Sequence, residues 1–172
     1  MALEAYFPFW NRLPLEEREA LERAATARFA PQGTILHNGS ADCVGLFAVR
    51  SGRLRAYLIS SEGKELTLYR LFERDLCVFS AACMLSSIRF EMTIEAERDS
   101  ELYLIPTETY RSLMQRSALV ANYTCEVISS HFTEVMWLMD QLLFKRFDAR
   151  LAAFLLEESA IEGGDALEIT HE

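Results

Sequence analysis

The sequence predicts a mainly β domain, a sandwich or barrel, followed by a long helical region. Between residues 34 and 105, short β-rich segments alternate with turn residues at roughly ten-residue intervals, which is typical of such folds. From Thr107 to Glu162 no Gly or Pro interrupts the chain. Within that stretch apolar residues recur at alternating spacings of four and three, the pattern of a helix that pairs along one narrow stripe.

An N-terminal helix is predicted over residues 14–29. Pro14 suits the first helical turn, and the acidic residues Glu16 and Glu17 follow it, where carboxylates complement the helix dipole. The Pro-Gln-Gly sequence at 31–33 then predicts a turn that separates this helix from the β region.

The predicted strands are separated by short turns such as Ser51-Gly52 and by polar connections. They cover residues 34–37, 44–50, 54–59, 66–72, 90–96 and 101–105. The run Leu76–Leu85 is continuously apolar, so we expect it to be buried as a strand followed by a short helix.

The helical region is predicted to begin with Thr107 as its N-cap, because a threonine side chain can accept a hydrogen bond from an exposed amide. The expected segments are helices over 107–115, 117–147 and 149–159, a turn at 163–165 and a short strand over 167–169. Residues 170–172 have the pattern of a helix cap with no helix behind it. We therefore expect the chain to be a piece of a longer protein.

The narrow apolar stripe of the long helix predicts a symmetric dimer, in which the stripe packs against a copy of itself. A single helix buried in a monomer core is the alternative. The stripe consists of Ala121, Cys125, Ile128, Phe132, Val135, Met139 and Leu142. A second set of apolar residues beside it is expected to pack on the helix's own domain: Val127, Met136, Trp137, Leu138 and Leu143.

Composition excludes several classes of protein. The net charge of the 172 residues is −9 and no basic run occurs, so this piece is not expected to bind nucleic acid by itself. No apolar stretch reaches the about 20 residues of a membrane span, and the N-terminus lacks the features of a signal peptide. We expect a cytoplasmic protein without membrane partners, whose four cysteines, none in a CxxC pair, stay reduced.

Several short motifs, in this order, resemble the Crp/Fnr family of bacterial transcription regulators. They are Ser51-Gly52, the Glu-Gly-Lys-Glu turn at 62–65, Asp75, the Phe-Asp-Ala-Arg-Leu-Ala run at 147–152 and the Leu-Glu-Ile-Thr-His-Glu run at 167–172. The resemblance implies a cyclic-nucleotide-binding-like double-stranded β-helix (jelly roll) with an N-terminal helix over 1–106. A short helix and a coiled-coil dimerisation helix over 107–147 would follow. Residues 148–172 would be a hinge and the start of a truncated helix-turn-helix domain.

By this resemblance the chain is the sensor and dimerisation portion of a regulator, and it is a homodimer. The full-length protein would bind DNA and RNA polymerase. A stand-alone regulatory or interaction module without DNA binding is the alternative. No enzyme is expected, since neither a nucleophile–base pair nor a phosphate-binding Gly loop occurs. A metal-dependent β-roll enzyme is set aside, because His37 is the lone histidine of the strand region.

Cyclic AMP is not the expected effector. Family members that bind it use a Gly-Glu pair and an Arg followed by a hydroxyl residue, and the corresponding positions here are Val78-Phe79 and Phe90-Glu91. Burying a phosphate without a cation is costly. The expected pocket is instead apolar, formed by Leu68, Leu71, Phe79, Phe90, Met92, Val135 and Met136. Either an unknown apolar or aromatic small molecule enters it, or these side chains fill it.

Haem and redox chemistry are weaker alternatives. His131 on the long helix could face the β-roll and ligate haem, but a lone helix histidine is more often a half-buried polar residue. Cys77 and Cys83 flank the pocket segment and could form a thiol switch, although buried cysteines usually behave as small hydrophobes. No cysteine spacing suits an iron–sulfur cluster, and no metal site is expected.

Overall fold

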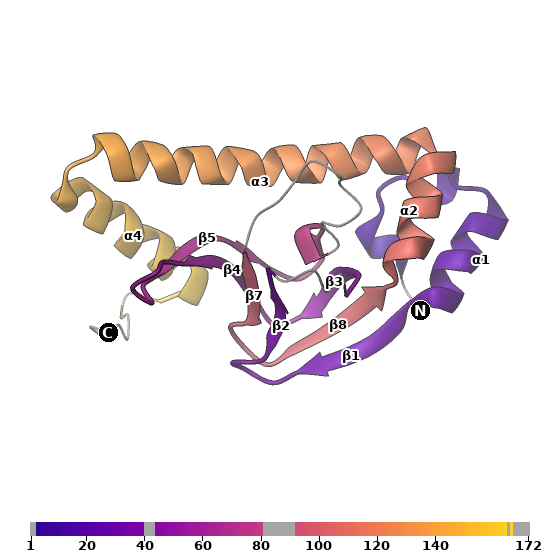
Figure 1. Ribbon diagram of the computed structural model, residues 1–172, viewed down its shortest axis with the longest axis horizontal. Helices are drawn as coiled ribbons and strands as arrows, with labels where there is room; N and C mark the ends of the chain where they lie inside the picture. The colour runs from indigo at the N-terminus through magenta and orange to yellow at the C-terminus, as the bar shows by residue number, and fades with distance from the viewer. Residues whose placement is uncertain (1–2, 40–43, 81–91, 165, 167–172) are drawn as a thin grey trace. The chain divides into compact units, whose positions relative to one another are not determined.

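The computed structural model describes residues 3–39, 44–80, 92–164 and 166. Two compact units make up the chain, one ending at Phe132 and the other beginning at Thr133. The first unit contains the strands, the N-terminal helices and the first half of the long helix α3 (Figure 1). In the described ranges, no helix has both the length and the hydropathy that crossing a membrane requires.

The described strands form two four-stranded antiparallel sheets, with orders β1-β8-β3-β6 and β2-β7-β4-β5. Their bounds are β1 Thr26–Ala30, β2 Ile35–Asn38, β3 Leu46–Ser51, β4 Leu54–Ile59, β5 Glu65–Leu71, β6 Leu76–Cys77, β7 Thr93–Ala96 and β8 Ser100–Ile105. This architecture confirms the predicted mainly β class and the jelly-roll type of fold. Of the strand expected over 90–96, residues 93–96 form β7, Met92 lies before the strand, and 90 and 91 lie outside the described residues.

The β2-β7-β4-β5 sheet has one apolar and one charged face, as strand alternation requires. Leu54 and Ala56 of β4 are fully buried on the inner face. Between them Arg55 points outward, where its guanidinium lies 2.7 Å from the Glu65 carboxylate and 3.2 Å from that of Glu95. These ion pairs join β4 to both neighbouring strands, so the charged face needs no covering element.

The prediction of a helix over 14–29 is wrong in its second half. Helix α1 spans Leu15–Ala24, and Thr26–Ala30 forms strand β1 instead. This strand pairs antiparallel with β8, with Thr26 opposite Leu104 and Ala30 opposite Ser100. Hydrogen bonding to β8 outweighs the local helical preference of an alanine-rich segment, which is a tertiary effect that propensity alone does not contain.

An aromatic N-terminal segment completes the core of the first unit. Two short 3-10 helices, Leu3–Tyr6 and Trp10–Arg12, precede α1, and neither was predicted. Phe7 is buried between them, with its ring stacked on Trp10 at a centroid distance of 6.1 Å. It also contacts Tyr123 of α3 edge-on, so this segment packs against the first turns of the long helix.

The helical region follows the predicted order. The helices are α2 Thr107–Arg116, α3 Ala118–Phe144 and α4 Phe147–Glu162. Thr107 is the first helical residue rather than the N-cap, which is Pro106 and makes no side-chain cap hydrogen bond. Gly163 ends α4 in the left-handed conformation at φ +69°, as the predicted turn requires. The strand expected over 167–169 lies outside the described residues.

The turn between β3 and β4 depends on Gly52. Its φ is +90°, and a Cβ there would collide with the carbonyl oxygen of Asp99 and with Ser100. Gly63, in the turn between β4 and β5, has a similar φ of +79° but open space around it. Both backbone conformations favour glycine, but only at Gly52 does the close approach of another strand also exclude a side chain.

Candidate functional site

Hydrogen bonds of two tyrosine hydroxyls hold the first half of α3 to the domain. The Tyr110 hydroxyl of α2 lies 2.9 Å from Thr124 Oγ1, and Thr124 in turn donates to the Val120 carbonyl at 2.8 Å, so tyrosine is the donor of the first bond. The Tyr123 hydroxyl donates to the Tyr6 carbonyl at 3.0 Å. Burial raises the pKa of Tyr110 to about 12, which keeps its hydroxyl protonated as a donor.

An aromatic–histidine cluster joins β5, the segment after β6 and α3. His131 is buried, and its ring stacks on that of Tyr69 with centroids 4.1 Å apart and planes inclined by 16°. Phe79 lies 6.1 Å from His131 and 6.2 Å from Tyr69, centroid to centroid. The Tyr69 hydroxyl donates to Met92 Sδ at 3.7 Å. We call Tyr69, Phe79, Met92 and His131 the aromatic–histidine cluster.

Local structure explains why these side chains meet. Tyr69 pairs opposite the fully buried Ala56 of β4, so it points to the inner face of its sheet. Phe79 follows β6 at a turn, where the hydroxyl of Ser80 lies 2.6 Å from the Gly45 carbonyl oxygen and 2.7 Å from that of Cys77. Ser80 is fully buried, and these contacts hold the turn beside β3.

The structure brings together part of the predicted pocket. Phe79 and Met92 belong to the aromatic–histidine cluster, and Leu71 is fully buried at the end of β5. Leu68 is partly buried, and it is three residues from Leu71 along the strand. Phe90 lies outside the described residues.

The two remaining predicted pocket residues, Val135 and Met136, belong to the second unit. Tyr69 and His131 are not among the predicted pocket residues, which are all aliphatic, Phe or Met side chains. The period-2 alternation of β5 would have selected Tyr69 together with Leu71. The helical spacing Val120, Thr124, Val127, His131 would have selected the histidine.

The cysteines have contrasting environments. Cys77 is fully buried, and burial raises the pKa of its thiol to about 11, so little reactive thiolate forms at neutral pH. Cys125 on α3 is exposed, and Cys83 lies outside the described residues. Among the residues that the structure describes, no group of three or more His, Cys, Asp and Glu side chains could hold a metal ion.

The predicted dimer stripe divides into two parts. Ile128 is partly buried against the core of the first unit, and Ala121 is half-buried. Cys125 and Phe132 are exposed, with 63% of Phe132 accessible to solvent. In the second unit Met139 and Leu142 are exposed as well, and Val135 is half-buried.

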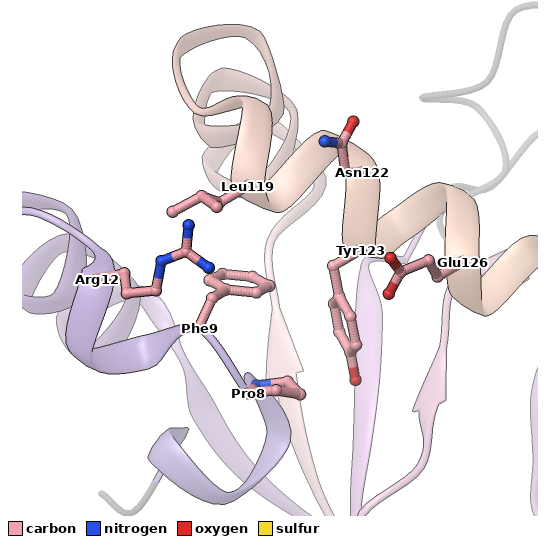
Figure 2. Close-up of a pocket in the computed structure, with 7 residues that line it drawn as sticks. All are labelled: Pro8, Phe9, Arg12, Leu119, Asn122, Tyr123 and Glu126. Carbon is pink, nitrogen blue, oxygen red and sulfur yellow. The ribbon is translucent and has the colours of Figure 1, made fainter.

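A surface cleft of about 410 Å³ lies between the N-terminal segment and the start of α3. Figure 2 shows its lining side chains, with Pro8, Phe9 and Arg12 on the N-terminal side and those of α3 opposite. The α3 side consists of Leu119, Asn122, Tyr123 and Glu126. Phe9 packs edge-on against Tyr123 at 5.3 Å between centroids, so the two walls of the cleft are in contact.

Residues 26–117 match the family model of the cyclic nucleotide-binding domain. The chain is 50% identical to a protein from Eubacterium rectale ATCC 33656 described as a transcriptional regulator of the Crp/Fnr family. That alignment covers 96% of this chain and 77% of the other, with a TM-score of 0.92. No curated protein matches the chain.

Two more distant solved structures have a similar fold. The catabolite activator protein of Thermus thermophilus is 26% identical, covering 91% of this chain and 72% of that one, with a TM-score of 0.61. The haem domain of CooA from Rhodospirillum rubrum is 21% identical, with coverage of 75% and 90% and a TM-score of 0.58, a likeness of fold alone.

Proposed function

Because this chain belongs to the Crp/Fnr family of transcription regulators, we propose that it is the sensor and dimerisation portion of a regulator that responds to a small effector other than cyclic AMP. The effector domain is the β-roll and the dimer forms along α3. DNA and RNA polymerase are partners of the full-length protein in the cytoplasm. The chain itself carries out no chemical reaction.

The observation that carries this proposal is the aromatic–histidine cluster. It joins β5 of the roll to His131 of α3 through a ring stack at 4.1 Å, so the state of the roll interior and the position of the helix are mechanically linked. A ligand that separated or replaced these rings would bind one helix position better than the other. Such a difference in affinity is what an effector needs to shift an equilibrium between two states.

The chemistry of the cluster favours an apolar or aromatic effector. Tyr69, Phe79 and Met92 offer ring faces and a thioether, and the imidazole and hydroxyl provide the few polar atoms that orient a ligand. Val78 is fully buried and Phe79 half-buried where cyclic AMP-binding relatives have their Gly-Glu pair.

Titration of the full-length dimer with cyclic AMP tests the choice of effector. We expect no saturable heat below millimolar nucleotide, and dissociation constants in the micromolar range would contradict the proposal. Native mass spectrometry of protein purified from its own host tests for the effector itself. We expect the dimer mass plus an apolar molecule that His131→Ala releases, with Ser130→Ala, an exposed helix position, as the retaining control.

A bare dimer mass from host-purified protein, identical for the parent chain and both variants, would contradict an apolar effector. A monomer mass would contradict the dimer itself.

A further inference from the structure

The cleft between the N-terminal segment and α3 carries opposite charges on its two walls. Arg12 extends from the N-terminal side and Glu126 from the α3 side, and Figure 2 shows the Phe9 and Tyr123 rings between them. Both charged side chains are exposed, and neither forms an ion pair with another residue of the described ranges. Each therefore remains available to a ligand that enters the cleft.

Apart from Asn122, the remainder of the lining consists of apolar and aromatic side chains. Phe9 is only 7% exposed, and its ring is held edge-on against Tyr123. The Tyr123 hydroxyl is already used by the Tyr6 carbonyl, so this residue presents its ring rather than a polar group. Burial, and after it the carboxylates of Asp75 and Glu126, raise the pKa of Tyr123, so its hydroxyl stays uncharged.

From this arrangement we propose that the cleft binds a free dipeptide with apolar side chains. The carboxylate of the peptide pairs with the planar guanidinium fork of Arg12, and its ammonium group pairs with Glu126. Its side chains cover Phe9 and Leu119, and the Asn122 amide can bond to the peptide group. A volume of about 410 Å³ lies within the range of small-molecule sites.

The separation of the charges decides against simpler ligands. An anion alone would leave Glu126 facing it, and a cation alone would leave Arg12 facing it, so either ligand meets a like charge. A single amino acid carries both of its charges on one carbon atom. The two charges of the cleft come from opposite walls with aromatic rings between them (Figure 2), which suits a ligand charged at the two ends of an apolar body.

Calorimetry with the dipeptide Leu-Phe tests this site in the full chain. We expect saturable binding, and at least tenfold weaker binding of acetyl-Leu-Phe, of Leu-Phe-amide and of free leucine. Arg12→Gln should remove recognition of the carboxylate, so this variant should bind Leu-Phe as weakly as it binds Leu-Phe-amide. Glu126→Gln should remove recognition of the ammonium group, so this variant should bind Leu-Phe as weakly as it binds acetyl-Leu-Phe.

Two control variants change the net charge by the same amount as the two cleft variants. Arg28→Gln on β1 and Glu16→Gln on α1 alter exposed charges of the same domain outside the cleft, and both should bind Leu-Phe as the parent chain does. Circular dichroism melting of all four variants checks that each is folded. Absence of saturable binding, or equal binding of Leu-Phe and its two blocked forms, would overturn the proposal.

Discussion

Tyr110 combines burial with a polar role. It is fully buried beneath the start of α3, and its hydroxyl bonds to Thr124. The ordinary tyrosine pKa of 10.0 is raised to about 12 in the folded chain, because burial penalises the phenolate. Removing this hydroxyl also leaves Thr124 Oγ1 with one hydrogen bond fewer in a buried setting.

Substitution of Tyr110 by Phe should lower the free energy of unfolding by about 1 kcal/mol at pH 8, the usual contribution of one buried hydrogen bond. Below pH 10 the parent hydroxyl is protonated in both states, whereas between pH 10 and 12 only the unfolded state ionises. The parent chain therefore loses stability on raising the pH through this range. Urea unfolding at pH 8 and at pH 10.5 measures this loss, and the free energy of unfolding should fall less between the two pH values for the Phe variant than for the parent chain. Equal losses for the two proteins would contradict the assigned role.

The residues of the aromatic–histidine cluster are harder to predict from the sequence than those of the core. Leu71, Met92 and Phe79 could be identified because apolar residues in a β region are usually buried. Local spacing can place Tyr69 and His131 on the inner faces of their elements, but residue type alone cannot, since each also occurs at half-exposed positions. Their pairing could not be predicted, because it is a 4.1 Å ring contact between a strand and a helix 62 positions apart in the chain.

Elements were predicted best where their pattern is local. The strand over 54–59 and the long helix follow from alternation and from the spacing of apolar residues, and both are confirmed within a few residues. Strand β1 was predicted as helix, because only its partner β8 stabilises it as a strand. The 3-10 helices of the N-terminal segment have no sequence period, so their aromatic packing was not predictable.

The β3–β4 turn provides a test at the level of one element. Gly52→Ala should destabilise the domain by several kcal/mol, because the new methyl group meets the Asp99 carbonyl in addition to the strain of a positive φ. Gly63→Ala has the same backbone strain in open space and should cost only about 1–2 kcal/mol. Thermal melting of both variants measures the difference. Similar melting temperatures for the two variants would contradict the prediction, because the chain around Gly52 would then accommodate the methyl group without a loss of stability.

The whole chain exposes many large apolar side chains on its helices. On α3 these include Phe132, Met136, Trp137, Met139 and Leu142. Exposed apolar residues in such number on one helix are typical of a protein interface. Four residues of the predicted stripe, Cys125, Phe132, Met139 and Leu142, are thus exposed in the single chain, in accord with the proposed homodimer.

Phe132→Asp should weaken the dimer at least tenfold, because a carboxylate would enter an interface from which water is excluded. Phe132 is 63% exposed in the single chain, so the fold itself should tolerate the change. Ile128→Asp would also weaken the dimer, but Ile128 packs on its own core and the variant would lose stability as well. Light scattering over a range of concentrations measures the mass, with the exposed Ser130→Asp as control. A Phe132→Asp dimer of unchanged affinity would exclude the stripe as the interface.

The continuity of α3 has a mechanical consequence. The helix passes without interruption from Ala118 to Phe144, across the boundary between the two compact units. From His131 to its end it extends about 20 Å at 1.5 Å per residue. By helix geometry alone, a tilt of a few degrees at the ring stack would displace the far end of a straight helix by on the order of an ångström.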